Sequence, residues 1–224
     1  MNSSGKADAS ATDRLRITEI FYSLQGEARS IGWPTVFIRL TGCPLRCGYC
    51  DTSYAFQGGE WCPLDTILQE VASYYTQHVT VTGGEPLAQK PCIKLLKLLC
   101  DSGYQVSLET SGALDIGEVD SRVVKVMDIK TPASGEADKN LDTNLQYLTS
   151  RDQVKFVLSD RNDYDWAVAF MQQHALAEKC EVLFSPVHGQ LEARQLADWI
   201  LADQLPVRFQ LQLHKLLWGD EPGR

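Results

Sequence analysis

The sequence has no uninterrupted apolar run of the roughly 20 residues that a membrane-spanning helix needs. Residues 1–13, rich in Ser, Ala, Asp and Gly, also lack the apolar centre of a secretory signal. These residues are expected to form a disordered leader, since they offer little apolar surface to bury. Together the two absences predict a cytoplasmic protein with no membrane partner.

Positive charge is also scarce. The 224 residues carry 21 Lys and Arg against 29 Asp and Glu, a formal net charge of -8. Proteins that bind nucleic acid neutralise phosphates with clustered Lys and Arg, and the sequence has no such cluster. Nucleic acid is therefore not expected as a partner, and a small-molecule substrate is favoured. The absence of internal repeats excludes a solenoid.

Cysteine, in contrast, is frequent and unevenly spaced. Three of the seven cysteines, Cys43, Cys47 and Cys50, form a C-x3-C-x2-C run. An odd number of cysteines, with three in one short loop, favours a metalloprotein of a reducing compartment over a disulfide scaffold. The other four are interpreted as structural, because free cysteine often packs as a small apolar side chain. They are Cys62, Cys92, Cys100 and Cys180.

Three neighbouring thiolates can surround one metal centre. A structural zinc ion takes four protein ligands, and a ferredoxin-type cluster takes one cysteine for each of its four irons. Three cysteines would leave one iron of a 4Fe-4S cluster open to a small molecule. Spacing alone leaves two alternatives: a zinc site whose fourth ligand is Cys62, Cys92 or a histidine, and a redox-active pair of thiols.

Strand-like and helix-like segments alternate after the leader. The apolar pattern predicts strands at 15–21 and 35–40 and a helix at 64–75. Further strands are expected at 78–82, 105–109, 123–129, 153–158, 181–184 and 207–213, and further helices at 92–100, 138–148, 164–174 and 192–202. This alternation predicts an α/β fold with a parallel sheet and helices outside it.

The chain is short for a complete (β/α) barrel, which typically needs roughly 250 residues. The segment between Gly112 and Val123 is also too short for an ordinary amphipathic helix. We therefore expect residues 14–224 to form a single domain built on an incomplete, truncated (β/α) barrel.

Residues able to do chemistry follow one predicted strand after another. In barrel-like α/β folds the carboxyl ends of the strands form the active face. One such segment contains Gly83 and Gly84, which would let a ligand approach the backbone closely, although a tight turn also explains two glycines. The residues and segments in question are Arg39, 82–86, 109–112, 128–132, 185–188 and 212–215.

The cysteine run resembles the cluster motif of the radical S-adenosylmethionine (SAM) superfamily, and Thr82–Pro86 resembles its GGE segment. Within that superfamily, four more segments resemble the 7-carboxy-7-deazaguanine synthase family: Phe21–Glu27, Cys50–Thr52, Leu108–Gly112 and Gln212–Lys215. The resemblance covers nearly the whole chain after the leader. It implies a truncated barrel of the radical SAM type.

The resemblance also implies a reaction. In the superfamily the open iron binds the amino and carboxylate groups of SAM, and an electron from the cluster releases a 5'-deoxyadenosyl radical. In the synthase family, whose members are carbon-nitrogen lyases, 6-carboxy-5,6,7,8-tetrahydropterin becomes 7-carboxy-7-deazaguanine with loss of ammonia, on the route to queuosine. We expect the radical to take a hydrogen from C6, the ring to contract and SAM to be regenerated. The protein then supplies binding and orientation.

Motif by motif, the resemblance implies a set of site residues. The cluster would be held by Cys43, Cys47 and Cys50, and Mg2+ by Thr52. SAM would be contacted by Tyr49, Asp51, Gly84, Asp128, Lys130, Ser185 and His188. The substrate would be contacted by Leu24, Gln25, Gly26, Arg39, Thr82 and His214.

Several of these residues suit a pterin. Gln25 can both donate and accept hydrogen bonds, and Arg39 offers a fork for a carboxylate. A single protein ligand such as the Thr52 hydroxyl can suffice for Mg2+, because waters or substrate oxygens can complete its coordination shell. Each residue also has an ordinary alternative. Gln25 could be a loop residue, Arg39 an edge-strand charge and His214 a core histidine, while the Thr52 hydroxyl could bond its own turn.

The implied partners are a reducing protein such as a flavodoxin and, in a homodimer, a second copy of the chain. Two other functions stay as alternatives. A glycyl-radical-enzyme activase has the same cysteine spacing but acts on a large protein, and a zinc-binding module would have no turnover. Leu24–Gly26 and His214–Lys215 favour the pterin enzyme over the activase.

Overall fold

The computed structural model describes residues 13–219, 221 and 223, and in this part of the chain nine strands form one sheet. Their order is β3-β1-β2-β4-β5-β6-β7-β8-β9. The strands are β1 (Arg14–Leu24), β2 (Pro34–Leu40), β3 (Glu60–Pro63), β4 (His78–Gly83), β5 (Gln105–Thr110), β6 (Val124–Ile129), β7 (Gln153–Leu158), β8 (Glu181–Pro186) and β9 (Arg208–Phe209). The leader predicted at 1–13 lies outside the described residues except for Asp13.

Most of the sheet is parallel. Every neighbouring pair from β2 to β9 is parallel, whereas β1 runs antiparallel to both β2 and β3. Among the described strands the edges β3 and β9 do not pair with each other, so the barrel stays open. The predicted α/β fold with an incomplete (β/α) barrel is confirmed.

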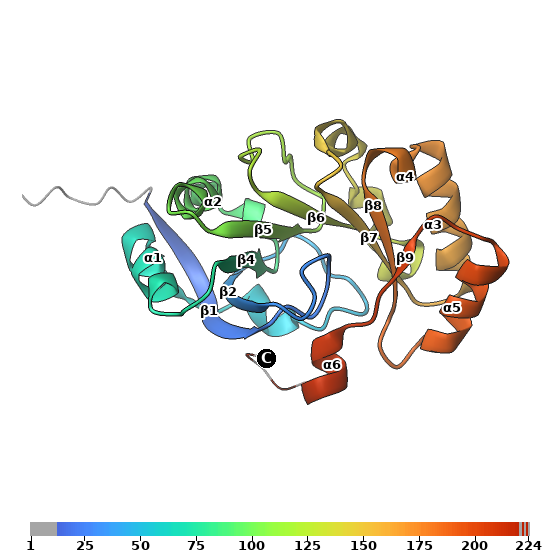
Figure 1. Cartoon of the computed structure of the whole chain (residues 1–224), viewed down its shortest axis with the longest axis horizontal. Helices are drawn as coiled ribbons and strands as arrows, with labels where there is room; N and C mark the ends of the chain where they lie inside the picture. Colours follow the sequence, from blue (N-terminus) through green and yellow to red (C-terminus); the bar gives the residue numbers. More distant parts are fainter. Residues whose placement is uncertain (1–12, 220, 222, 224) are drawn as a thin grey trace, which may run out of the picture.

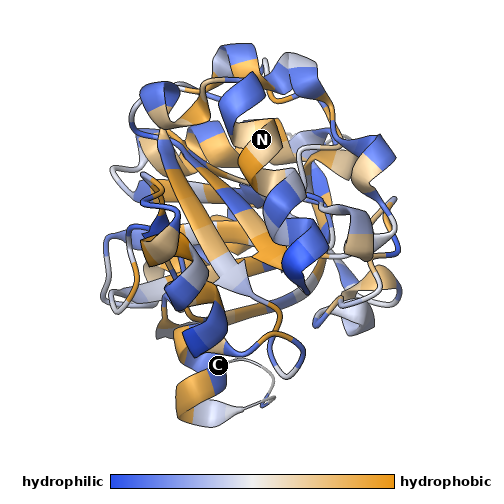
Figure 2. Ribbon diagram, turned by 90° about the vertical axis from the view of Figure 1, so that its right-hand side faces the viewer, coloured by the Kyte–Doolittle hydropathy of each residue, from blue (hydrophilic) through white to orange (hydrophobic). Residues whose placement is uncertain are grey.

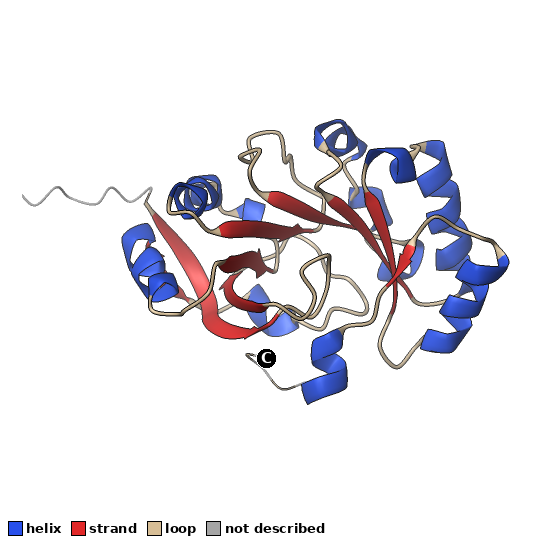
Figure 3. Ribbon diagram, in the orientation of Figure 1, coloured by secondary structure: helices blue, strands red, loops and turns tan. Residues whose placement is uncertain are grey.

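Helices cover the outside of the curved sheet, and loops occupy its concave side (Figure 1, Figure 3). Ile67 and Val71 of α1, and Leu95 and Leu99 of α2, are fully buried. Full burial of such a side chain stabilises the fold by about 1.5–3 kcal/mol. The helices are α1 (Leu64–Ala72), α2 (Pro91–Asp101), α3 (Arg161–Gln173), α4 (Leu176–Lys179), α5 (Ala193–Ala202) and α6 (Leu213–Trp218).

Figure 2 shows the apolar residues concentrated in the strands and on the helix faces that meet them. The remaining elements are short 3-10 turns: η1 (Ser53–Phe56), η2 (Pro86–Ala88), η3 (Pro132–Ser134), η4 (Ala137–Lys139) and η5 (Asp142–Tyr147). Between β5 and β6 the described chain forms no helix, as predicted. None of the described helices combines the length and the apolar character needed to cross a bilayer.

The helix predicted at 138–148 is wrong, because this segment forms only the turns η4 and η5. Asn144 gives the reason. Its buried side-chain amide donates to the carbonyls of Gly112 and Leu114 and accepts from the N–H of Ile116. A side chain that satisfies loop backbone in this way competes with regular helix formation.

The strand predicted at 207–213 is also mostly wrong. Only Arg208–Phe209 pairs with β8 in the described structure. The chain then turns back, and the N–H of Leu213 donates to the carbonyl of Gly26 at 2.9 Å, where α6 begins. His214 therefore lies on a helix that docks on the loop after β1, and not at a strand end. The sequence pattern also missed β3.

Candidate active site

A pocket of about 550 Å³ opens at the carboxyl ends of the parallel strands. Sixteen of the predicted site residues line it, and they come from segments spread between β1 and α6. They are Leu24, Gln25, Gly26, Arg39, Cys43, Cys47, Tyr49, Cys50, Asp51, Thr52, Thr82, Gly84, Asp128, Lys130, His188 and His214.

Ser185 is the predicted site residue that does not line this pocket. It lies on β8, its side chain is buried, and its hydroxyl has no hydrogen-bond partner among the described residues. His188, three residues later in the loop, does reach the pocket and is exposed.

The cysteine loop is held by two backbone hydrogen bonds to neighbouring segments and by the side chain of Arg46. The N–H of Gly42 donates to the carbonyl of Ala55 at 2.8 Å, and the N–H of Gly48 donates to that of Ser134 at 2.9 Å. The guanidinium of Arg46 donates to the carbonyl of Cys43 at 2.8 Å and lies over the ring of Phe56, 4.3 Å from its centroid. These contacts fix the loop, so the three thiols face the pocket from a defined backbone.

Gly84 is required by close packing of the β4 end against this loop. A β-carbon at Gly84 would lie 2.2 Å from the carbonyl oxygen of Gly42 and 2.7 Å from the β-carbon of Cys43. The N–H of the next residue, Glu85, donates to the same Gly42 carbonyl at 2.9 Å. No side chain larger than hydrogen fits between the GGE segment and the first cluster cysteine.

The carboxylate of Glu85 joins the GGE segment to the end of β5. It is fully buried and accepts hydrogen bonds from the hydroxyls of Thr110 and Ser111 and from the N–H groups of Ser111 and Leu87. A buried carboxylate needs such donors, because burying it unpaired would cost several kcal/mol. The two motifs therefore form one rigid unit.

The arrangement of the three cysteines fits a cluster. Among the described residues, no three His, Cys, Asp or Glu side chains gather where one metal ion could be held. A cluster takes each cysteine on a different iron and so needs the sulfurs spread farther apart. Of the candidate fourth zinc ligands, Cys62 on β3 and the buried Cys92 on α2 do not line the pocket, whereas the histidines His188 and His214 do. All seven cysteines are free.

Burial raises the pKa of both the Cys43 and the Cys47 thiols. The positive charge of Lys130 opposes this shift and lowers the pKa of both thiols. The ammonium of Lys130 lies 3.0 Å from Asp128 Oδ2, while Asp128 Oδ1 is buried without a partner among the described residues. An orphaned carboxylate oxygen at the pocket wall fits a ligand hydroxyl, so the residues present suit both a cluster and SAM.

Tyr49 lies between this pair and the cysteines. Burial, followed by the charge of Asp128, raises the pKa of its hydroxyl to about 12. The hydroxyl therefore stays protonated at neutral pH and can only donate or accept hydrogen bonds.

The loop after β1 forms the opposite wall. Gln25 is buried, and its side-chain amide donates to Thr80 at 3.0 Å and to Glu109 at 3.3 Å, while its oxygen accepts from the N–H of Glu27. Gly26 is packed against α6, since a β-carbon there would lie 2.3 Å from Nδ1 of His214. Gln25 thus holds the loop in shape as well as facing the pocket.

Burial lowers the pKa of His214, although the nearby carboxylates of Glu27 and Asp51 oppose this. A lowered pKa favours the neutral imidazole, which has one donor and one acceptor nitrogen.

Arg39 is oriented by one partner. Its Nε donates to Glu19 Oε1 at 2.7 Å, and its guanidinium lies 5.6 Å from the ring centroid of Phe21 and 5.8 Å from that of Tyr54. The hydroxyl of Tyr54 donates to the same Glu19 oxygen at 2.8 Å. Arg39 thus lines the pocket with its Nε already engaged by Glu19.

Thr52 follows the last cluster cysteine and donates its hydroxyl to Asp51 Oδ1 at 2.7 Å. Although burial opposes it, this bond and the charges of Lys215 and Lys155 lower the pKa of Asp51. Asp51 is thus ionised at neutral pH, and the Thr52 oxygen keeps its lone pairs for another partner.

The predicted contacts did not include the pocket residues Glu27, Glu109, Lys155 and Gln212, although all of these except Lys155 lie in motif segments named from the sequence. Glu27 Oε1 accepts from Gln212 at 2.8 Å, and its other oxygen lies 2.5 Å from the ammonium of Lys155. Glu109 Oε2 accepts from Thr82 at 2.9 Å. One available signal was a lysine in the otherwise apolar run after Gln153, since a lone charge in a buried strand needs a partner.

The chain matches known proteins along most of its length. The family model described as the radical SAM superfamily matches residues 37–129. A 7-carboxy-7-deazaguanine synthase of Chlorobaculum tepidum is 45% identical over 210 residues, covering 92% of this chain and 96% of that protein. One from Koribacter versatilis is 43% identical, covering 92% and 98%.

The fold has a matching neighbour among solved structures. The crystal structure of QueE from Escherichia coli superposes with a TM-score of 0.76 and 23% identity, covering 90% of this chain and 95% of that one. These findings lend no support to a glycyl-radical activase or a zinc module. The chain therefore belongs to the 7-carboxy-7-deazaguanine synthase family of radical SAM enzymes.

Proposed function

We propose that this chain converts 6-carboxy-5,6,7,8-tetrahydropterin into 7-carboxy-7-deazaguanine with release of ammonia, in the biosynthesis of queuosine or another 7-deazapurine. One observation carries the proposal. A single pocket joins three free cysteines to a guanidinium, Arg39, and to a floor of amide and carboxyl groups. That combination matches a cluster beside a substrate with an anionic end and an amide edge.

The cysteines Cys43, Cys47 and Cys50 hold a 4Fe-4S cluster in this proposal, and SAM lies between them and β6. The cluster and SAM together supply the carbon radical when bound. Gly84 lets the amino acid part of SAM approach the backbone, and the orphaned Asp128 oxygen accepts from a hydroxyl of the cofactor. The other proposed SAM contacts are Tyr49, Asp51, Lys130 and His188, whereas Ser185, buried on β8 outside the pocket, is not among them.

The substrate lies against the opposite wall. Arg39 binds its carboxylate through the terminal nitrogens, since Nε is already held by Glu19. The loop Leu24–Gly26, with Thr82 and His214, meets the pyrimidine edge. The neutral form that burial favours lets His214 accept or donate without adding charge.

Thr52 is proposed as a ligand of Mg2+, with substrate and water oxygens completing the shell. Its position in the pocket, with its hydroxyl hydrogen pointed at Asp51, supports this role. Titrating Mg2+ with the wild type and with Thr52→Val tests it. The variant should need more Mg2+ for half-maximal rate and should keep its SAM affinity.

An external reductant, such as a flavodoxin, and a homodimeric assembly complete the proposal. The exposure of Pro44, Arg46 and Gly48 in the cysteine loop supports access by a reductant. The partly exposed stacked pair of Trp33 and His78, 5.1 Å between centroids, supports an aromatic protein contact. Light scattering of the purified protein tests the dimer.

The deciding experiment is an anaerobic assay with reconstituted protein, dithionite, SAM, Mg2+ and the pterin, with the product followed by mass spectrometry. We expect 7-carboxy-7-deazaguanine and ammonia in equal amounts. Loaded protein that cleaves SAM but leaves the pterin unchanged would contradict the proposal.

Arg39→Gln should raise KM for the pterin roughly 10- to 100-fold, the value of one charge-assisted hydrogen bond. Arg29→Gln is the matched control, since Arg29 pairs with Glu181 at 3.5 Å and does not line the pocket. Equal KM values for the pterin in the two variants would show that Arg39 does not bind the substrate.

A further inference from the structure

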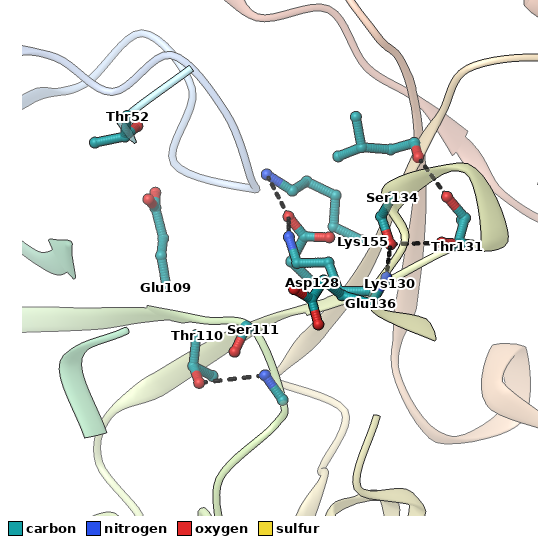
Figure 4. A network of polar contacts seen from close by, with 12 residues as sticks. Thr52, Glu109, Thr110, Ser111, Asp128, Lys130, Thr131, Ser134, Glu136 and Lys155 are labelled. Carbon is teal, nitrogen blue, oxygen red and sulfur yellow. Dashed lines mark hydrogen bonds and ion pairs between the residues drawn. The ribbon is translucent and has the colours of Figure 1, made fainter. Parts of the chain in front are cut away.

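Lys155 occupies the middle of the pocket wall, between the two ligand regions. It lies on β7 in register with Asp128 of β6, and its side chain is 13% exposed. Its ammonium lies 2.5 Å from Glu27 Oε2 and 3.6 Å from Asp128 Oδ2. Figure 4 shows the ammonium groups of Lys155 and Lys130 directed at the same carboxylate, that of Asp128.

The two carboxylates that share Lys155 belong to different halves of the site. Glu27 directly follows the loop Leu24–Gly26, the proposed substrate region. Asp128 belongs to the end of β6, the proposed SAM region, where one of its oxygens has no partner among the described residues. Lys155 is thus a single cation between a substrate-side anion and a cofactor-side anion.

The cation is needed where it lies. Three carboxylates act on it, those of Glu27, Asp128 and Glu109, and together they raise the pKa of Lys155 against the opposing effect of burial. Without the ammonium these carboxylates would face one another in a partly buried pocket, where like charges are costly.

The ammonium of Lys155 lies closer to Glu27 than to Asp128, so it can shift from the first carboxylate to the second. In this structure Lys155 is engaged with Glu27 and only loosely with Asp128. A pterin N–H that hydrogen-bonds to Glu27 competes with the ammonium for that carboxylate. The flexible lysine stem then lets the ammonium move toward Asp128 Oδ2, where it joins Lys130, 3.0 Å from the same oxygen, in holding the carboxylate that faces SAM.

We propose that Lys155 is a positioning residue that couples the substrate and SAM subsites, so that a bound pterin strengthens the binding of SAM. The inference rests on the proposed function. By reciprocity SAM strengthens the binding of the pterin by the same factor. Neither ligand has to touch Lys155 for this coupling.

The test is equilibrium dialysis of the anaerobic, cluster-loaded protein without reductant, so that no turnover occurs. The dissociation constant of SAM is measured with and without saturating 6-carboxytetrahydropterin. In the wild type the pterin should lower it at least about fivefold. In Lys155→Met the ratio should fall to near one, whereas Lys155→Arg, which can still reach both carboxylates, should keep most of it.

Lys125→Met is the matched control. Lys125 is also a buried lysine on this sheet, 3.1 Å from Asp152, but it lies outside the pocket. Its loss should reduce stability and leave the ratio unchanged. If Lys155→Met does not fold, Glu27→Gln replaces it, because removing the substrate-side anion should also abolish the coupling.

The outcomes are distinguishable. Wild-type protein that binds SAM but not the pterin overturns the proposed function itself. Wild-type protein that binds both, with the ratio intact in Lys155→Met or in Glu27→Gln, overturns only the coupling role. A ratio lost equally in Lys125→Met also overturns it, because the effect would then follow from general destabilisation.

Discussion

Lysine–aspartate pairs lie at both ends of the β6–β7 pair of strands, buried at the amino end and partly buried at the carboxyl end, and they differ in how fully they are bonded. At the amino end, Asp152 accepts from the N–H and ammonium of Lys125 and from the N–H and hydroxyl of Thr149, all at 2.8–3.1 Å. At the carboxyl end, Asp128 Oδ2 meets Lys130 and Lys155, and Oδ1 has no partner among the described residues.

The difference separates structure from function. A carboxylate whose oxygens are all satisfied stabilises the fold and has nothing left to offer a ligand. A carboxylate left half-bonded at a pocket wall costs stability unless something else completes it. The amino end therefore serves folding, and the carboxyl end is arranged for ligands.

The largest expected effect comes from the cysteines at the carboxyl end. Cys47→Ala should lose the cluster, and product formation should fall to background, because the remaining two cysteines cannot hold it. Iron and sulfide analysis after anaerobic reconstitution measures this. Cys180→Ala, next to β8 and outside the pocket, is the control and should keep the full iron content. A full iron content in Cys47→Ala would show that Cys47 does not hold the cluster, and that the carboxyl end is not the cluster site.

The second prediction concerns stability at the amino end. Asp152→Ala leaves the ammonium of Lys125, 6% exposed, without its carboxylate, and should reduce the free energy of unfolding by about 3–5 kcal/mol. Asp128→Ala should lose less, because Lys130 at 12% exposure is better solvated than Lys125 and Lys155 keeps Glu27, but should weaken SAM binding. Urea denaturation and SAM dialysis measure the two effects. Equal losses of stability would mean that both pairs are structural.

The third prediction compares two glycines. Gly84→Ala should reduce the free energy of unfolding by about 1–3 kcal/mol, because the new methyl group would collide with backbone atoms of Gly42. The variant should also bind SAM more weakly, because the methyl group would displace the backbone that SAM approaches in the proposal. Gly117→Ala is the control at the amino end. Its β-carbon would meet only side-chain atoms of Tyr147 and Asp115, which can move. Thermal denaturation and SAM dialysis distinguish the two variants, and unchanged SAM binding in Gly84→Ala would count against the assigned contact.

The smallest effect is a gain in stability at the site. Burial, and then the charge of Glu27, raises the pKa of Glu109. A carboxyl with a raised folded-state pKa destabilises the fold at pH values above that pKa, where it is ionised. Glu109→Gln should therefore raise Tm at neutral pH, with about 2–4 °C for each kcal/mol gained.

This gain should shrink as the pH falls and disappear below the ordinary pKa of glutamic acid, because the wild-type carboxyl is then protonated in both the folded and the unfolded state. Glu118→Gln, at an exposed position in the loop before β6, should show no such pH dependence. Thermal scans between pH 4 and pH 8 measure both variants. A lower Tm for Glu109→Gln at neutral pH would show that the ionised Glu109 carboxylate does not destabilise the fold.

Sequence reasoning found much of the pocket because its key features are local. Three cysteines within one loop, and two glycines at the end of a strand, can be recognised without a fold. The element order followed as well, since β7 has the predicted bounds and β2, β4, β5 and β6 each differ from the prediction by one residue at one end. The helix at 138–148 could not be judged locally, because Asn144 bonds to a loop some 30 residues away.

What the sequence by itself determined is local: three cysteines in one loop, a close-packed glycine segment and an alternation that folds into an open parallel barrel. Only the tertiary structure decided which charges meet. Glu27 and Lys155 are 128 residues apart and make the shortest ion pair of the pocket. Such contacts depend on strand order and on the return of α6 to the loop after β1. Periodicity and spacing along a chain describe neighbours within a few residues, so they carry no information about contacts between residues that are far apart in the sequence.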